Sequence, residues 1–97
     1  MLDRQTIEKV KQITFSHIDP QKYKVFIFGS WATKTARRFS DIDIGISGDE
    51  QVPLEKLTLL QDAFEDSDIP YTVDVVPFYK TSLRFKEVAM QHVISLN

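Results

Sequence analysis

With 97 residues and a formal net charge of −2, the chain is long enough for one domain and too short for two. Its 42% hydrophobic and 27% charged residues exclude a disordered segment, and the absence of cysteine excludes a disulfide scaffold and thiolate metal sites. No apolar run approaches the roughly 20 residues of a membrane span, and the charged start is unlike a signal peptide. We therefore expect a single domain over residues 1–97, cytoplasmic and without a membrane partner.

The charge is unevenly distributed along the chain. Residues 1–38 hold eight Lys or Arg against three Asp or Glu, a balance of +5, whereas residues 39–80 hold two against ten, a balance of −8. Such blocks are typical of solvated faces, but they also arise where carboxylates gather around a cation and basic groups face an anion. The small net charge gives no reason to expect direct nucleic-acid binding.

The first part of the chain predicts a helix followed by a buried strand. Asp3 is a suitable N-cap, and inward-facing positions recur at helical spacing from Ile7 to Thr14, before Asp19-Pro20 ends the helix. Residues 23–28 (YKVFIF) are β-branched or aromatic and largely apolar on both faces. This favours a central strand that is covered on both sides.

The middle of the chain predicts a short turn of helix, a strand and a longer helix. Gly29-Ser30 ends the first strand, and residues 31–36 have room for one or two helical turns. Residues 41–47 (DIDIGIS) alternate strictly, with isoleucine on one face. Pro53 suits the first position of a helix. Its apolar stripe consists of Leu54, Leu57, Leu60 and Phe64.

The last third predicts one more strand and a final helix. Ser67 to Pro70 breaks the preceding helix, and residues 71–76 (YTVDVV) form a strand closed by Pro77. Ser82 is placed to cap a helix that runs to Leu96. The order αβαβαβα indicates an α/β (α+β) fold, a small mixed β-sheet flanked by helices.

Two carboxylates mark the start of the second strand. Asp41 and Asp43 are two residues apart, so both side chains project from one face while the isoleucines pack on the other. Close carboxylates repel each other and resist desolvation, and a divalent cation such as Mg²⁺ or Mn²⁺ removes both costs. The alternative is an exposed edge strand with polar residues facing outward.

Asp74 adds a third carboxylate, within an apolar strand. A charge in the apolar run of a central strand is unfavourable without a partner, and the alternation places Asp74 on the face opposite Val73 and Val75. If its strand neighbours the strand of Asp43, three carboxylates converge on one side of the sheet. Such a trio can hold two metal ions roughly 3.5–4 Å apart, the arrangement used for nucleotidyl displacement.

The turn after the first strand complements these carboxylates. Gly29 allows close backbone approach, and Ser30 offers a hydroxyl and N–H groups to a phosphate, although such a pair is also a simple helix cap. The whole pattern is Gly-Ser, ten residues, Asp-x-Asp, and a strand-borne aspartate about thirty residues later. The combination is far more specific than any of its parts.

This pattern resembles the minimal nucleotidyltransferase (MNT) family of the DNA-polymerase-β-type nucleotidyltransferase superfamily. The resemblance rests on residues 29–46 (GSWATKTARRFSDIDIGI) and on YTVDVV, within a layout that spans residues 23–76. It implies an enzyme that binds a nucleoside triphosphate with two Mg²⁺ ions, or with Mn²⁺, and transfers the nucleoside monophosphate to a hydroxyl. Pyrophosphate is released.

The resemblance also implies a role for each site residue. Gly29 and Ser30 hold the triphosphate tail. Asp41 and Asp43 ligate the metal ions, and Asp74 ligates the ion that activates the acceptor hydroxyl and takes its proton.

The chain departs from the Gly-Ser-Arg-Ala-Arg-Gly sequence of many relatives. Trp31 and Thr33 replace the two arginines and Lys34 replaces the last glycine, which bears on triphosphate affinity and loop shape but not on the metal ligands. Lys34, Arg37 and Arg38 either supply positive charge to phosphates or belong to a solvated loop. Trp31 stacks on a base, docks a partner or packs in the interior.

A partner is implied as well. Minimal members resemble the antitoxins of HEPN/MNT systems, whose all-helical HEPN toxin offers a tyrosine as acceptor, with ATP as the implied donor of AMP. The short chain, which leaves little to hold an acceptor, agrees with this. The rival interpretation is a binding module that neutralises a partner by contact, without catalysis.

Two further sets of residues leave alternatives open. Phe78, Tyr79, Val93 and Ile94 suit either an interface with a partner or the core. His17 and His92 lack metal-ligand spacing, and we expect structural or surface roles for both.

Overall fold

The structure is a computed structural model, and it describes residues 2–34, 36, 40–79 and 91–97. An N-terminal helix is followed by strands that alternate with helices, as far as residue 77 in the order that the sequence predicts. The elements are α1 (Arg4–Phe15), β1 (Tyr23–Phe28), α2 (Ser30–Thr33), β2 (Ile42–Gly48), α3 (Leu54–Glu65), β3 (Val73–Pro77) and β4 (Ile94–Ser95). The expected α/β class with flanking helices is confirmed.

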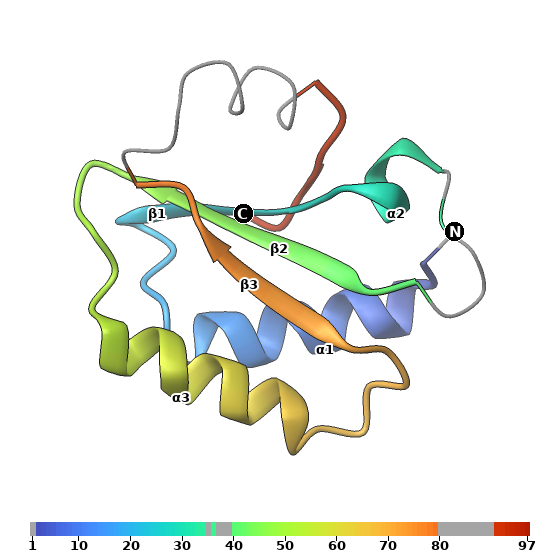
Figure 1. Ribbon diagram of the computed structural model, residues 1–97, viewed down its shortest axis with the longest axis horizontal. Helices are drawn as coiled ribbons and strands as arrows, with labels where there is room; N and C mark the ends of the chain where they lie inside the picture. Colours follow the sequence, from blue (N-terminus) through green and yellow to red (C-terminus); the bar gives the residue numbers. More distant parts are fainter. Residues whose placement is uncertain (1, 35, 37–39, 80–90) are drawn as a thin grey trace.

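The strands form one mixed sheet of four strands in the order β3-β2-β1-β4. β1 pairs antiparallel with both β2 and β4, whereas β2 and β3 run parallel. α1 and α3 lie together on one side of this sheet (Figure 1). The predicted central position of β1 is correct. The strand of Asp74, which we expected to be central as well, is an edge strand of the described sheet.

The final helix from Ser82 to Leu96 is wrong in its last part. Ser82 itself lies outside the described residues, but Ile94–Ser95 form β4, which pairs with Phe26 and Ile27 of β1. The Asn97 side chain continues this pairing, because its Oδ1 accepts from the Val25 N–H at 2.9 Å. A free edge of β1 thus takes up the C-terminal residues as a strand, a long-range pairing that helical spacing cannot reveal.

The start of α1 matches its predicted cap. Asp3 has extended backbone dihedrals, and its Oδ1 accepts from the Thr6 N–H at 2.9 Å. Hydrogen bonding by the Thr6 side chain, and then by this Thr6 N–H, lowers the pKa of Asp3. The inward face of α1 then carries Val10 and Thr14, both fully buried.

The core lies between the sheet and the two long helices. The isoleucines of β2 all face it, as the alternation predicts, and Leu60 and Phe64 of α3 pack against them. Leu54 is the exception in the predicted stripe, because at the first position of α3 its side chain is 78% exposed. No helix within the described residues is long and apolar enough to cross a membrane.

One buried polar atom lacks a partner in this core. The Thr14 hydroxyl is fully buried and makes no hydrogen bond in the structure. Because an unsatisfied buried hydroxyl carries its full desolvation cost, we expect Thr14→Val to raise the free energy of unfolding by about 1 kcal/mol in urea denaturation. Thr58→Val in α3 is the control, since the exposed Thr58 hydroxyl donates to the Leu54 carbonyl at 3.0 Å. An equal gain in both variants would contradict this explanation.

Candidate active site

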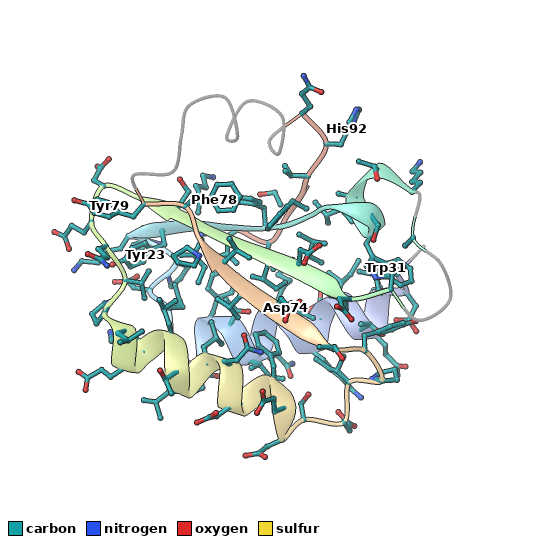
Figure 2. All side chains as sticks on the ribbon, viewed as in Figure 1. Tyr23, Trp31, Asp74, Phe78, Tyr79 and His92 are labelled. Carbon is teal, nitrogen blue, oxygen red and sulfur yellow. The ribbon has the colours of Figure 1, made fainter. Side chains whose placement is uncertain are left out.

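The pairing of β2 with β3 places two of the predicted carboxylates side by side. Asp43 and Asp74 are direct partners in the parallel ladder, and the next pair along it is Ile44 with Val75. Since neighbours in register share a face, both carboxylates lie on the side of the sheet opposite the isoleucine core. Figure 2 labels Asp74 on β3. The strands of Asp43 and Asp74 are therefore neighbours, as the predicted cluster of carboxylates requires.

Asp43 sits in the tightest part of this arrangement. It is half-buried, with Phe28 of β1 as its partner on one side and Asp74 on the other. Gly29 follows Phe28 with φ of 75°, and a Cβ built on it would collide with the Asp43 carboxylate oxygen Oδ2. Only glycine lets the chain turn this close to the carboxylate, so the strand-end glycine has a specific structural reason.

The electrostatics of Asp43 are unfavourable in the protein alone. Burial raises its pKa, and the nearby charges of Asp74 and then Asp41 raise it further. Both effects disfavour the ionised carboxylate, and a bound cation would oppose both. The fold therefore places a carboxylate where a positive charge is the missing component.

The partly buried, unfavourable carboxylate is Asp43, whereas the sequence indicated Asp74. Asp74 was expected to be the costly charge of a central strand, but it is exposed and belongs to an edge strand. Asp41 is also exposed and lies immediately before β2. An apolar run in a sequence does not distinguish an edge strand from a central one, and for this reason the buried charge was assigned wrongly.

The three predicted carboxylates do not form a complete metal site by themselves. Among the described residues, no group of three His, Cys, Asp or Glu side chains is arranged to hold a metal ion. Asp43 and Asp74 form the adjacent pair, and the Asp41 charge is near enough to affect Asp43. Carboxylate oxygens are the donors that Mg²⁺ prefers, so the donor set fits such an ion. The assignment of Asp41, Asp43 and Asp74 as metal ligands stays a prediction.

The residues that flank α2, Gly29 and Lys34, both have a positive φ. α2 is a single turn that starts at Ser30, and Lys34 caps it in the left-handed conformation with φ of 62°. Lys34 occupies the position where the resembling family carries glycine, and its N–H donates to the Ser30 carbonyl. Lys34 thus adopts the left-handed conformation that glycine accepts readily, although for lysine it is less favourable by roughly 1 kcal/mol.

Trp31 belongs to the interior. Its side chain is 7% exposed, and its indole N–H donates to the Ser40 carbonyl at 2.9 Å. Of the three expected uses, packing is the one the structure supports, because so buried a ring offers no face to a base. Arg37 and Arg38 lie outside the described residues.

The other residues with open alternatives divide between core and surface. Phe78 is 1% exposed and meets the rings of Phe26 and Phe28, each with centroids 5.2 Å away, so it is buried in an aromatic cluster on the face of the sheet opposite the isoleucines. Tyr79 is 37% exposed, while Val93 and Ile94 are half-buried. Figure 2 places His92 on the C-terminal segment, where it is exposed. His17 is half-buried, with Nδ1 at 3.1 Å from the Ile13 carbonyl oxygen.

The paired carboxylates and the glycine turn coincide with a known family. Residues 7–96 match the nucleotidyltransferase domain. The chain belongs to this nucleotidyltransferase family. The resemblance drawn from its motifs is thereby confirmed.

A curated relative and solved structures add detail to the family. The Probable protein adenylyltransferase MntA of Haemophilus influenzae is 35% identical over 66 residues, which are 68% of this chain and 58% of that protein. The match thus spans less than two thirds of the relative's length. A toxin–antitoxin structure with AMP-PNP superposes with a TM-score of 0.74 at 22% identity, covering 94% of this chain and 72% of that one.

A second structure shares the fold. It is a tri-AMPylated Shewanella oneidensis HEPN toxin in complex with an MNT antitoxin, which gives a TM-score of 0.71 at 16% identity. The superposition covers 99% of this chain and 72% of that chain. At such identities the likeness establishes the nucleotidyltransferase fold.

The raised pKa of Asp43 predicts a pH-dependent effect on stability. A carboxyl whose pKa is higher in the folded state favours folding less as pH rises through that pKa, so the ionised group destabilises the fold at neutral pH. We therefore expect Asp43→Asn to raise the melting temperature of the metal-free protein at pH 7 in the presence of a chelator. The gain should vanish as pH falls below the ordinary value of 3.8.

A matched substitution tests the cause. Asp49→Asn removes the same charge from an exposed position beyond the opposite end of β2. It should leave the melting temperature nearly unchanged across the same pH range. A gain for Asp43→Asn that persisted at low pH would contradict the electrostatic origin.

Proposed function

We propose that the chain is an Mg²⁺-dependent nucleotidyltransferase that transfers AMP from ATP to a tyrosine hydroxyl of a HEPN-type toxin and so acts as its antitoxin. The observation that carries the proposal is the pair of adjacent carboxylates, Asp43 and Asp74, beside the close Gly29 turn. Family membership supports the reaction class. The adenylyltransferase name of the Haemophilus relative and the AMP-PNP of a structural neighbour support ATP as donor.

Asp41, Asp43 and Asp74 are the residues that would hold the metal. When bound, two Mg²⁺ ions would neutralise charge on the triphosphate and lower the pKa of the acceptor hydroxyl. Asp43 would be the fixed ligand, because strand pairing and burial hold it in place. Asp41 and Asp74 are exposed and free to complete the set.

The chain's own residues account for binding and proton transfer. The Gly29-Ser30 turn would hold the triphosphate at the start of α2, where Gly29 lies against the Asp43 carboxylate and Ser30 offers its hydroxyl. A bond forms between the acceptor oxygen and the α-phosphorus, while the bond from that phosphorus to the bridging oxygen breaks and pyrophosphate leaves. The hydroxyl proton passes to Asp74, whose exposed carboxylate is open to an incoming group.

A cavity borders the edge strand that carries Asp74. It has a volume of about 520 Å³ and opens at the edge of β3, between that strand and α3. Phe64, Ile69 and Tyr71 contribute apolar walls, and Asp74 lies at its border. Its lining also includes the polar residues Gln61, Glu65 and Thr72.

The first test of this function is metal-dependent nucleotide binding. We expect calorimetry to detect AMP-PNP binding only with Mg²⁺ or Mn²⁺. Asp43→Asn should weaken it by more than the roughly 10–100-fold that loss of an outer-shell partner of a metal costs. Asp49→Asn is again the control. Binding that needs no metal and survives Asp43→Asn would overturn the metal-dependent mechanism.

The second test separates nucleotide binding from transfer. With ATP, Mg²⁺ and a HEPN-type partner, intact-mass spectrometry should find AMP added to a partner tyrosine. Asp74 would hold the ion at the acceptor hydroxyl and take its proton, whereas Asp41 and Asp43 would hold the ion at the triphosphate. Asp74→Asn should therefore lower kcat by about 10²–10⁴-fold while leaving AMP-PNP affinity within a few-fold of wild type.

One outcome would favour the rival function. If the partner gains no mass and yet loses its activity when mixed with the chain, the chain neutralises by contact alone. Unchanged neutralisation by Asp43→Asn would support the same conclusion, because a contact mechanism does not need the carboxylates.

A further inference from the structure

Trp31 is the single tryptophan of the chain and the second residue of α2. α2 has only four residues, and no side chain caps its N-terminus. So short a helix has no stability of its own in water, because the cost of nucleation exceeds the gain from its few hydrogen bonds. Something other than local propensity must hold the turn that follows Gly29 in place.

The indole N–H provides one tie. It donates to the Ser40 carbonyl at 2.9 Å, and Ser40 is the residue directly before Asp41. The bond joins residues nine positions apart and lies in a partly buried setting. It therefore links the start of α2 to the entry of β2, where the Asp-x-Asp pair begins.

The indole ring provides a second tie. It meets the Tyr71 ring edge to face, with centroids 5.2 Å apart and an interplanar angle of 74°. Tyr71 lies two residues before β3 and three before Asp74. Figure 2 shows Trp31 at this end of the sheet, near the start of β3. The same residue thus reaches the segments that lead to both carboxylate strands.

The starts of β2 and β3 are already joined to each other. The Ile42 N–H donates to the Thr72 carbonyl at 2.9 Å, which fixes the carboxylate strands in register. Trp31 contacts both of these segments from α2, and it does so with a buried side chain. Its 7% exposure also excludes a direct role as a stacking surface for a base.

We propose that Trp31 is a positioning residue. Its side chain contacts the segments before Asp41 and before Asp74 at the same time, and it thereby fixes the position of the Gly29-Ser30 turn relative to the carboxylates. The proposal rests on the proposed function, in which the turn holds the triphosphate and the carboxylates hold the metal. The position that carries arginine in many relatives serves here as an internal anchor.

Two substitutions separate the ties. Trp31→Phe keeps an aromatic edge for Tyr71 but has no N–H for Ser40, and Trp31→Leu removes both contacts. Because small displacements of reacting groups cost up to about 100-fold in rate, we expect kcat/KM for AMP transfer to fall about tenfold in Trp31→Phe and about 100-fold in Trp31→Leu. The KM for ATP should rise in both, since the triphosphate turn is displaced.

The control removes core packing without touching the site. Val10 is fully buried in α1, and Val10→Ala lowers stability through a small cavity. Compared at a temperature where all variants are folded, Val10→Ala should retain the wild-type KM and kcat. If it loses as much activity as Trp31→Phe at an equal melting temperature, Trp31 acts through stability alone and the proposal fails.

A readout independent of activity completes the test. Hydrogen exchange in the metal-free protein should become faster at the hydrogen-bonded N–H groups of residues 32, 33 and 42 in Trp31→Phe, while those of α1 stay as slow as in wild type. AMP-PNP affinity with Mg²⁺ should fall in parallel. Unchanged exchange and affinity would overturn the proposal. If instead wild type binds no AMP-PNP, the proposed function fails, and the exchange data still decide whether Trp31 holds the turn.

Discussion

The parallel pairing of β2 with β3 is the constraint on which the site depends. It places Asp43 directly beside Asp74 and so creates a repulsion that the protein alone does not relieve. Hydrogen bonds at both ends of the pair hold the register, from Ile42 to the Thr72 carbonyl and from Phe78 to the Ile46 carbonyl. A slip by one residue would turn the Asp74 side chain into the core and abolish the pair, so the buried isoleucines and valines enforce the register.

The same strand is kept accessible at the edge of the sheet. Edge strands invite pairing with other chains, and Gln61 of α3 limits this, because its amide donates to the Val73 carbonyl and accepts from the Val75 N–H. Pro77, at the end of β3, has no N–H to offer. With these groups satisfied by a side chain in place of another strand, the cavity beside Asp74 stays open.

The sequence was sufficient for what depends on local patterns. Alternation assigned Asp43 and Asp74 to the face opposite the core, and Gly29 at a strand end predicted a close approach. Long-range pairing was beyond its reach: β4 forms only because β1 has a free edge, and the same order of strands decides that Asp43, not Asp74, is the more buried charge. The anchoring contacts of Trp31 were equally hidden, because they depend on three segments that meet only in the folded chain.

Within the described residues, an unfavourable backbone conformation and an unfavourable charge lie close together at α2. Gly29 and Lys34, which begin and end α2, are the two described residues with positive φ, and Asp43, whose pKa is raised, touches the first of them. Strained or electrostatically unfavourable residues persist in proteins mainly at functional sites, because selection for stability alone would remove them. The buried Thr14 hydroxyl of α1, which has no hydrogen-bond partner, is also unfavourable, but no second such feature lies beside it in the described residues. At the α2 turn a positive-φ backbone and an unfavourable carboxylate coincide, and a bound cation would relieve the charge.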